Sequence, residues 1–201
     1  MATTDKASTR DRLLDAAAEL FYREGVSLGV EALCRSAGVS KRSMYQLFAG
    51  KDEVLAASLA RRLPEYEERL VPGPQEEAGG PRARILHVFE QLEKASAEPG
   101  YLGCPFLAAL VELKAPEHPA SVVAHGAKER LLGFFRTQAE EGGARDPELL
   151  ARQLMLVFDG AGARAGARIE TLDGLTTTTV TALLDASGTL VNGRPPRRGP
   201  R

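Results

Sequence analysis

Apolar residues recur every three to four positions along most of this 201-residue sequence, which is the spacing of one face of an α-helix. No segment alternates apolar and polar residues for long enough to predict a strand. Ala, Leu, Glu and Arg are abundant, and these residues have high helix propensity. The sequence therefore predicts an all-α fold, and its 43% of apolar residues suffice for a core.

Glycines, prolines and capping residues divide this pattern into separate helices. Ser8 or Thr9 caps a first helix that ends at Gly25, and Pro64 is expected to kink or stop a helix that begins at Lys51. Asp146 and Pro147 mark a further helix start. A linker is expected at 71–81, and the other helices are expected at 30–36, 41–48, 82–97, 105–113, 119–141 and 176–190. Val122 is expected to be buried in its helix.

The segment 29–48 reads as two short helices that cross at a tight turn, which is a helix-turn-helix. Gly38 supplies the turn, where a positive φ is expected, and the small Cys34 lets the helices approach. Apolar residues fall where the shared core would lie, namely Leu33, Ala37, Val39, Met44 and Leu47.

The outer face of this motif is basic although the net charge of the chain is -1. Residues 32–51 contain four basic residues and no acidic one. A recognition helix uses such residues on phosphates and base edges, with Gln46 suited to adenine and Arg42 or Lys41 to guanine. A generic helical hairpin with a solvated basic face is the alternative. The predicted DNA contacts are Arg35, Ser40, Lys41, Arg42, Ser43, Tyr45, Gln46 and Lys51.

The run AGVSKRSMYQLFAGKDEVL resembles the TetR family of bacterial regulators, and LLDAAAELFYREG resembles the first helix of that family. The resemblance is specific over residues 6–66. It implies that Tyr45 and Lys51 contact phosphates. The family usually opens the second helix with Thr or Ser, whereas this chain has Gly29, which puts one phosphate contact in doubt.

The resemblance also implies a domain order: a DNA-binding domain at 6–66 and a ligand-binding and dimerisation bundle at 82–191. The tail 193–201 is rich in Pro, Gly and Arg and is expected to be disordered. GCPFL, His118-Pro119 and DPELLARQL resemble a TetR subgroup. The Gly/Ala run at 159–167 suits a close helix contact between two copies. The alternative interpretation is that the glycines loosen or break this helix.

In this family the second half also holds an effector pocket, for which Phe89, Phe106, Phe134 and Phe158 are candidates; ordinary core residues are the alternative. Cys104 precedes Pro105 and could carry a redox signal, but a small buried side chain is the simpler interpretation. Cys34 is expected to be structural.

Catalytic signatures are missing from the sequence, because we find no nucleophile–base pair and no phosphate loop. The three histidines, His87, His118 and His125, do not have the spacing of metal ligands. We therefore expect no enzyme, no metal and no cofactor. The start of the chain does not resemble a signal peptide, and no apolar run spans a membrane, so a cytoplasmic protein is expected. The expected partners are a double-stranded DNA operator, a second copy of the chain and an unidentified small-molecule effector. A repressor released by that effector is the main hypothesis, and a redox-sensing regulator acting through Cys104 is the alternative.

Overall fold

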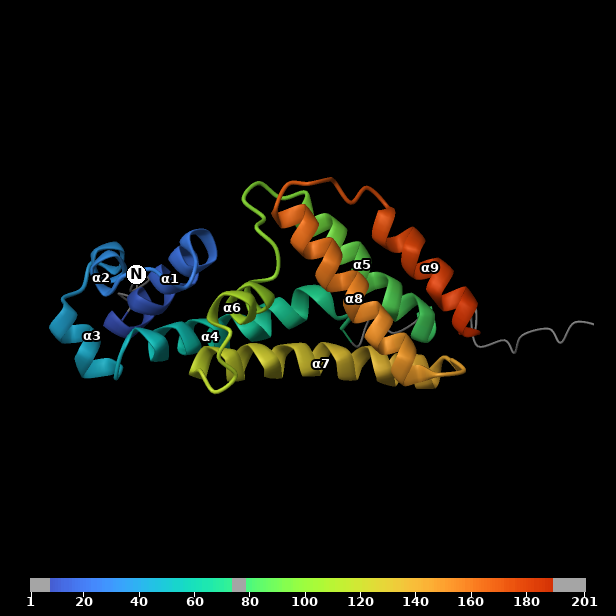
Figure 1. Ribbon diagram of the computed structural model, residues 1–201, viewed down its shortest axis with the longest axis horizontal. Coiled ribbons are helices and arrows are strands. Elements are labelled where there is room, and N and C mark those ends of the chain that lie inside the picture. Colours follow the sequence, from blue (N-terminus) through green and yellow to red (C-terminus); the bar gives the residue numbers. More distant parts are fainter. Residues whose placement is uncertain (1–7, 74–78, 190–201) are drawn as a thin grey trace, which may run out of the picture. The chain divides into compact units, whose positions relative to one another are not determined.

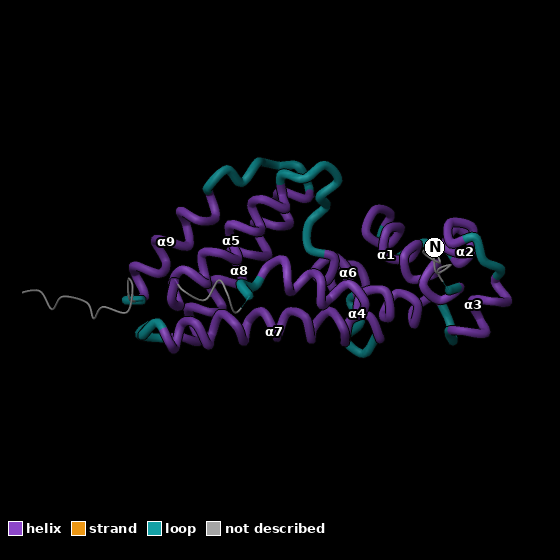
Figure 2. The backbone as a smooth tube through the Cα atoms, turned by 180° about the vertical axis from the view of Figure 1, so that it is seen from behind, coloured by secondary structure: helices purple, strands orange, loops and turns teal. Residues whose placement is uncertain are grey.

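The computed structural model describes residues 8–73 and 79–189, and every regular element in them is a helix (Figures 1 and 2). The all-α prediction is therefore confirmed. The helices are α1 (Thr9–Glu24), α2 (Val30–Ala37), α3 (Lys41–Leu47), α4 (Lys51–Leu70), α5 (Gly80–Ser96), α6 (Pro105–Leu113), α7 (Pro119–Glu141), α8 (Pro147–Gly166) and α9 (Leu175–Ser187). The tail 193–201 lies outside the described residues. No helix within the described ranges is long and apolar enough to cross a membrane.

Most helix starts follow the local signals in the sequence. Ser8 accepts a hydrogen bond from the Asp11 backbone N–H, and Asp146 accepts one from that of Leu149, with Pro147 at the first helical position. Each side chain satisfies a backbone donor that has no partner within its own helix. The predicted caps are thus confirmed.

The predicted effect of Pro64 is wrong in one respect, because α4 continues past it to Leu70. A proline removes one backbone hydrogen bond from a helix and costs about 3 kcal/mol or more. The residues that follow compensate by packing: Leu70 is buried in an apolar cluster, and Tyr66 packs against it. Tertiary burial therefore outweighs the local preference to stop.

The structure divides into two compact units. Among the described residues, the first unit comprises 8–64 together with Pro105–Ala127, and the second comprises 65–73, 79–104 and 128–189. This division groups α6 and the start of α7 with the helix-turn-helix residues, so the units are not consecutive in sequence. The boundaries of the functional domains stay a prediction.

In the first unit, α1 packs against both α2 and α3. The inward face of α7 here consists of small side chains: Ala120, Ser121 and Ala124 are all buried, whereas Val122 is 60% exposed. The predicted burial of Val122 is therefore wrong. The helix buries Ser121 instead, which lies about 100° away around the helix axis, and leaves Val123 half-buried.

In the second unit, α5, α8 and α9 lie side by side and pack pairwise (Figures 1 and 2). Phe89 of α5 stacks on Phe135 of α7 with ring centroids 5.6 Å apart and meets Phe158 of α8 edge-on at 6.2 Å. Aromatic pairs favour such offset and edge-to-face arrangements. These rings form the centre of the apolar core of this unit.

The start of α9 is closed by a residue distant in the sequence. Its N-cap Gly174 has a φ of 84° and offers no side-chain hydrogen bond. Instead, the Glu93 carboxylate on α5 accepts hydrogen bonds from the backbone N–H groups of Gly174 (3.1 Å), Thr176 (3.0 Å) and Thr177 (3.1 Å), and from the Thr176 hydroxyl. A carboxylate also stabilises a helix N-terminus electrostatically.

Backbone meets backbone where α8 passes the loop that precedes α6. A Cβ on Gly166 would overlap backbone atoms of Leu102 and Gly103, and one on Gly103 would lie 3.2 Å from the Gly162 carbonyl oxygen. Gly103 and Gly166 are thus required inside their own unit. On the opposite face of α8, Gly160 and Ala163 of the predicted small-residue run are exposed.

Candidate nucleic-acid interface

The turn between α2 and α3 has the geometry that its sequence predicts. Gly38 adopts φ 63° and ψ 38°, and its backbone N–H donates to the carbonyl of Arg35. The N–H of Val39 donates to the carbonyl of Cys34 at 3.0 Å, which completes the helix C-cap. Ser40 then caps α3 by accepting from the Ser43 backbone N–H at 3.0 Å.

The two helices share an apolar core. Leu33, Cys34, Ala37 and Met44 are all buried, and burial raises the pKa of the Cys34 thiol. The prediction is wrong for Leu47, which is 43% exposed. Phe48 occupies the inward position instead, four residues after Met44, and is 5% exposed.

The outer face of α3 carries the predicted DNA contacts. Lys41, Arg42, Tyr45 and Gln46 are all exposed, as are Arg35 on α2 and the cap residue Ser40, while Ser43 is half-buried. Tyr45 is 56% exposed, which is unusual for an aromatic side chain in a closely packed motif. These side chains are therefore accessible to a macromolecular partner.

Lys41 has a partner that the sequence did not reveal. Its ammonium group forms an ion pair with the Glu31 carboxylate on α2, and the two side chains are 52% and 62% exposed. The hydrogen bond from Lys41 holds the pKa of the Glu31 carboxyl below its usual value, and the same bond raises the pKa of Lys41.

Lys51 is less exposed than the resemblance implied. Its ammonium donates to the carbonyl of Val26 at 2.9 Å, and the Val26 backbone N–H donates to the Glu112 carboxylate of α6 at 2.7 Å. One loop residue between α1 and α2 is thus bound by both α4 and α6. A phosphate contact by Lys51 would compete with this internal hydrogen bond.

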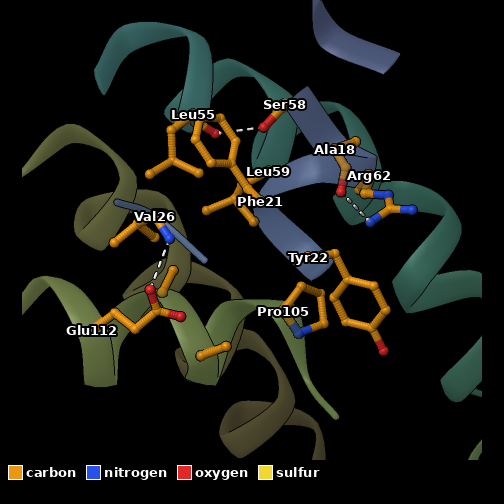
Figure 3. A pocket seen from close by; sticks show the side chains of 12 residues that line it. Ala18, Phe21, Tyr22, Val26, Leu55, Ser58, Leu59, Arg62, Pro105 and Glu112 are labelled. Atoms are coloured by element: carbon orange, nitrogen blue, oxygen red, sulfur yellow. Dashed lines mark hydrogen bonds between the residues drawn. The ribbon is translucent and has the colours of Figure 1, made fainter. Parts of the chain in front are cut away.

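Figure 3 shows the cavity beside Glu112, which is lined by residues of α1, α4 and α6. Its volume is about 20 Å³, which is room for about one water molecule. The polar groups at its edge are already engaged: Ser58 donates to the Leu55 carbonyl and Arg62 to that of Ala18. This cavity is too small for an effector molecule.

His118 connects the start of α7 to that of α4. Its Nδ1 accepts from the Ala120 backbone N–H at 3.1 Å, so it caps α7. Its Nε2 lies 3.4 Å from an Asp52 carboxylate oxygen. Within the described ranges, no three His, Cys, Asp or Glu side chains gather as a metal site would require.

The candidate pocket phenylalanines divide between the units. Phe89 and Phe158 are in ring contact and fully buried in the second unit, where Phe134 is half-buried beside Phe135. Phe106 belongs to the first unit and is 1% exposed. Their packing is that of core residues, and a ligand-binding role stays a prediction.

Comparison with known proteins agrees with this geometry. Residues 13–58 match the family model described as bacterial regulatory proteins, tetR family. The crystal structure of sav143 from Streptomyces avermitilis, described as a TetR transcriptional regulator, is 55% identical, with a TM-score of 0.89 over 92% of this chain and 100% of that one.

Curated relatives match over shorter segments. SrpR of Pseudomonas putida is 43% identical over 65 residues, which is 32% of this chain and 30% of that protein. The Escherichia coli repressor NemR is 32% identical over 98 residues, or 48% of this chain and 49% of NemR. The chain thus matches less than half the length of either relative.

An exposed basic helix on a buried helix-turn-helix core defines a DNA-binding transcription regulator. This chain belongs to the TetR family, as its full-length similarity to sav143 establishes. Regulators of that family bind DNA operators and act as dimers.

Proposed function

We propose that this protein is a repressor that binds its operator as a homodimer in the cytoplasm and releases it when a small molecule binds. The observation that carries the proposal is the exposed face of α3, which presents basic and amide side chains, while the inward face packs into the apolar core shared with α2. A recognition helix of this kind enters the major groove and reads bases near its N-terminus.

The outer faces of α8 and α9 support dimerisation. These helices contact each other, and both expose apolar or small side chains, including Leu156 at 75% exposure and Leu175 at 49%. Gly160 and Ala163 lie on the same exposed side of α8 and allow close approach of a second copy. Two copies would present recognition helices to half-sites about 34–36 Å apart.

Effector release requires that the ligand bind one conformation better than the other. A coupling of about 1–3 kcal/mol lowers operator affinity about 5- to 150-fold. Phe89, Phe134 and Phe158 are the proposed apolar contacts in the second unit, with Phe106 in the first. Since coupling is reciprocal, such a ligand must bind the operator complex more weakly than the free protein.

The DNA contacts are tested by anisotropy titrations with a random-sequence duplex and with a sequence selected from a random pool. Tyr45→Phe and Lys51→Ala should weaken binding to both duplexes, and Lys51→Ala, which also removes a positive charge, should reduce the salt slope by about 0.9. Gln46→Ala should instead reduce only the preference for the selected sequence. Lys94→Ala, an exposed lysine on α5, is the matched control.

Full affinity of either Tyr45→Phe or Lys51→Ala at moderate salt would refute the phosphate contact assigned to that residue. Thermal melting must accompany Lys51→Ala, because its ammonium also bonds the Val26 carbonyl.

A redox-sensing regulator is the second candidate. Cys104 accepts a hydrogen bond from the Tyr66 hydroxyl at 3.2 Å, which brings a polar group to the thiol. However, Cys104 is only 7% exposed, whereas reactive cysteines are partly accessible, so burial favours a structural role. A gel shift with a thiol oxidant, repeated on Cys104→Ala, separates the two candidates.

A further inference from the structure

The Glu31–Lys41 pair places a negative charge at the start of the proposed DNA-reading helix. Lys41 is the first residue of α3, and Glu31 lies in the first turn of α2. No other acidic residue occurs from 31 to 51. The pair therefore neutralises one of the four positive charges of the basic segment before any DNA is bound.

The local backbone explains why the carboxylate lies there. Gly29 is the N-cap of α2 and offers no side-chain hydrogen bond. The Glu31 carboxylate lies close to this helix start, because a Cβ on Gly29 would lie 3.7 Å from Glu31 Oε2. A free helix N-terminus attracts phosphate, whereas this one already holds an anion.

Binding to any phosphate near Lys41 then has an added electrostatic cost. Lys41 must give up its ion pair with Glu31 before its ammonium can bind the phosphate. Both side chains are more than half exposed, so the pair is weak enough to be broken. A random sequence provides phosphates alone and so bears this cost, whereas at the correct sequence base contacts by Arg42 and Gln46 supply affinity while Lys41 stays paired with Glu31.

We propose that Glu31 is a specificity-determining residue that acts through Lys41, by pairing with its ammonium and so weakening attachment to DNA of the wrong sequence. The proposal rests on the DNA-binding function proposed above. In this proposal, specificity arises because binding to DNA of the wrong sequence is made weaker. Penalising the wrong partner is one of two general routes to specificity.

The test measures the affinity of the full-length protein for a random-sequence duplex over a range of about 50 to 200 mM salt. Glu31→Gln should bind this duplex about two- to fivefold more tightly at low salt. The slope of log affinity against log salt should steepen by about 0.9, because Lys41 gains a phosphate. Affinity for the pool-selected sequence should rise less, so the ratio of the two affinities should fall.

Two further variants show whether the effect passes through Lys41. In a Lys41→Met background, Glu31→Gln should have no remaining effect on the salt slope. Glu24→Gln removes an equal charge from the exposed end of α1 and should leave the slope unchanged. Thermal melting of each variant checks that the fold is intact.

An unchanged slope for Glu31→Gln overturns the proposal, as does an equal gain for Glu24→Gln or a gain that persists without Lys41. These results differ from a failure of DNA binding itself, in which the wild-type protein would bind neither duplex at any salt concentration.

Discussion

The starts of α3 and α9 show two ways of closing a helix. At α3 the cap is local, because Ser40 accepts from the backbone of Ser43 three residues later. At α9 the cap is tertiary, because Glu93 is supplied by α5 from 81 residues before Gly174. A local cap forms with its helix, whereas a tertiary cap forms only when two distant elements have docked. The helix-turn-helix therefore holds its shape through short-range contacts, and α9 depends on the rest of its unit.

Removing the tertiary cap should have the largest effect. Glu93→Ala leaves several partly buried N–H groups of α9 without an acceptor and should lower the free energy of unfolding by about 2–3 kcal/mol. Glu93→Gln, which keeps one acceptor oxygen, should lose less. Chemical denaturation measures both, and Glu90→Ala, an exposed glutamate on the same helix, is the control. A loss no greater than that of the control would show that docking does not need this cap.

Changing the turn of the helix-turn-helix should have a moderate effect. Gly38→Ala places a side chain at φ 63°, which should cost about 1–2 kcal/mol. The cost is backbone strain alone, because the nearest atom to the new Cβ is 3.8 Å away. Gly133→Ala in α7 is the converse control: its Cβ meets open space in a helix interior, so it should stabilise by up to about 1 kcal/mol. Melting curves should therefore shift in opposite directions, and a shift in the same direction would contradict the assigned strain.

Removing a local cap should have the smallest effect. Asp146→Ala takes one acceptor from the start of α8 and should cost about 1 kcal/mol by the same denaturation assay. Asp146→Asn retains a capping oxygen and should lie within about 0.5 kcal/mol of the wild-type protein. If Asp146→Ala destabilised the protein more than Glu93→Ala, the distinction between local and tertiary caps would fail.

The same distinction explains what the sequence could predict. Ser40, Gly38 and the Asp146-Pro147 pair act within a few residues, and their roles follow from the sequence alone. The roles of Glu93, Glu31 and Glu112 depend on partners from other helices or from a distant loop, and no local pattern marks them. The bounds of α6 and α7 match their predictions, whereas the continuation of α4 past Pro64 depends on the core that receives Leu70.

The wrong predictions of which residues are buried have a related cause. Leu47 and Val122 fit an apolar periodicity, but each helix buries a neighbouring position instead. Around Val122 the inward positions are Ala and Ser, whose small size gives little hydrophobic signal. The sequence predicted which side chains lie on the exposed face of α3, whereas the internal partners of Lys41 and Lys51 depend on the tertiary structure.

The contact of α8 with residues 101–103 has a mechanical consequence. At Gly162 and Gly166 the backbones meet with no intervening side chain whose rotamer could change to absorb a displacement. Close-packed interiors compress little and transmit strain. A shift of α8 along its axis would therefore displace residues 101–103 by a similar amount. Cys104 and the first turn of α6 follow these residues directly in the chain.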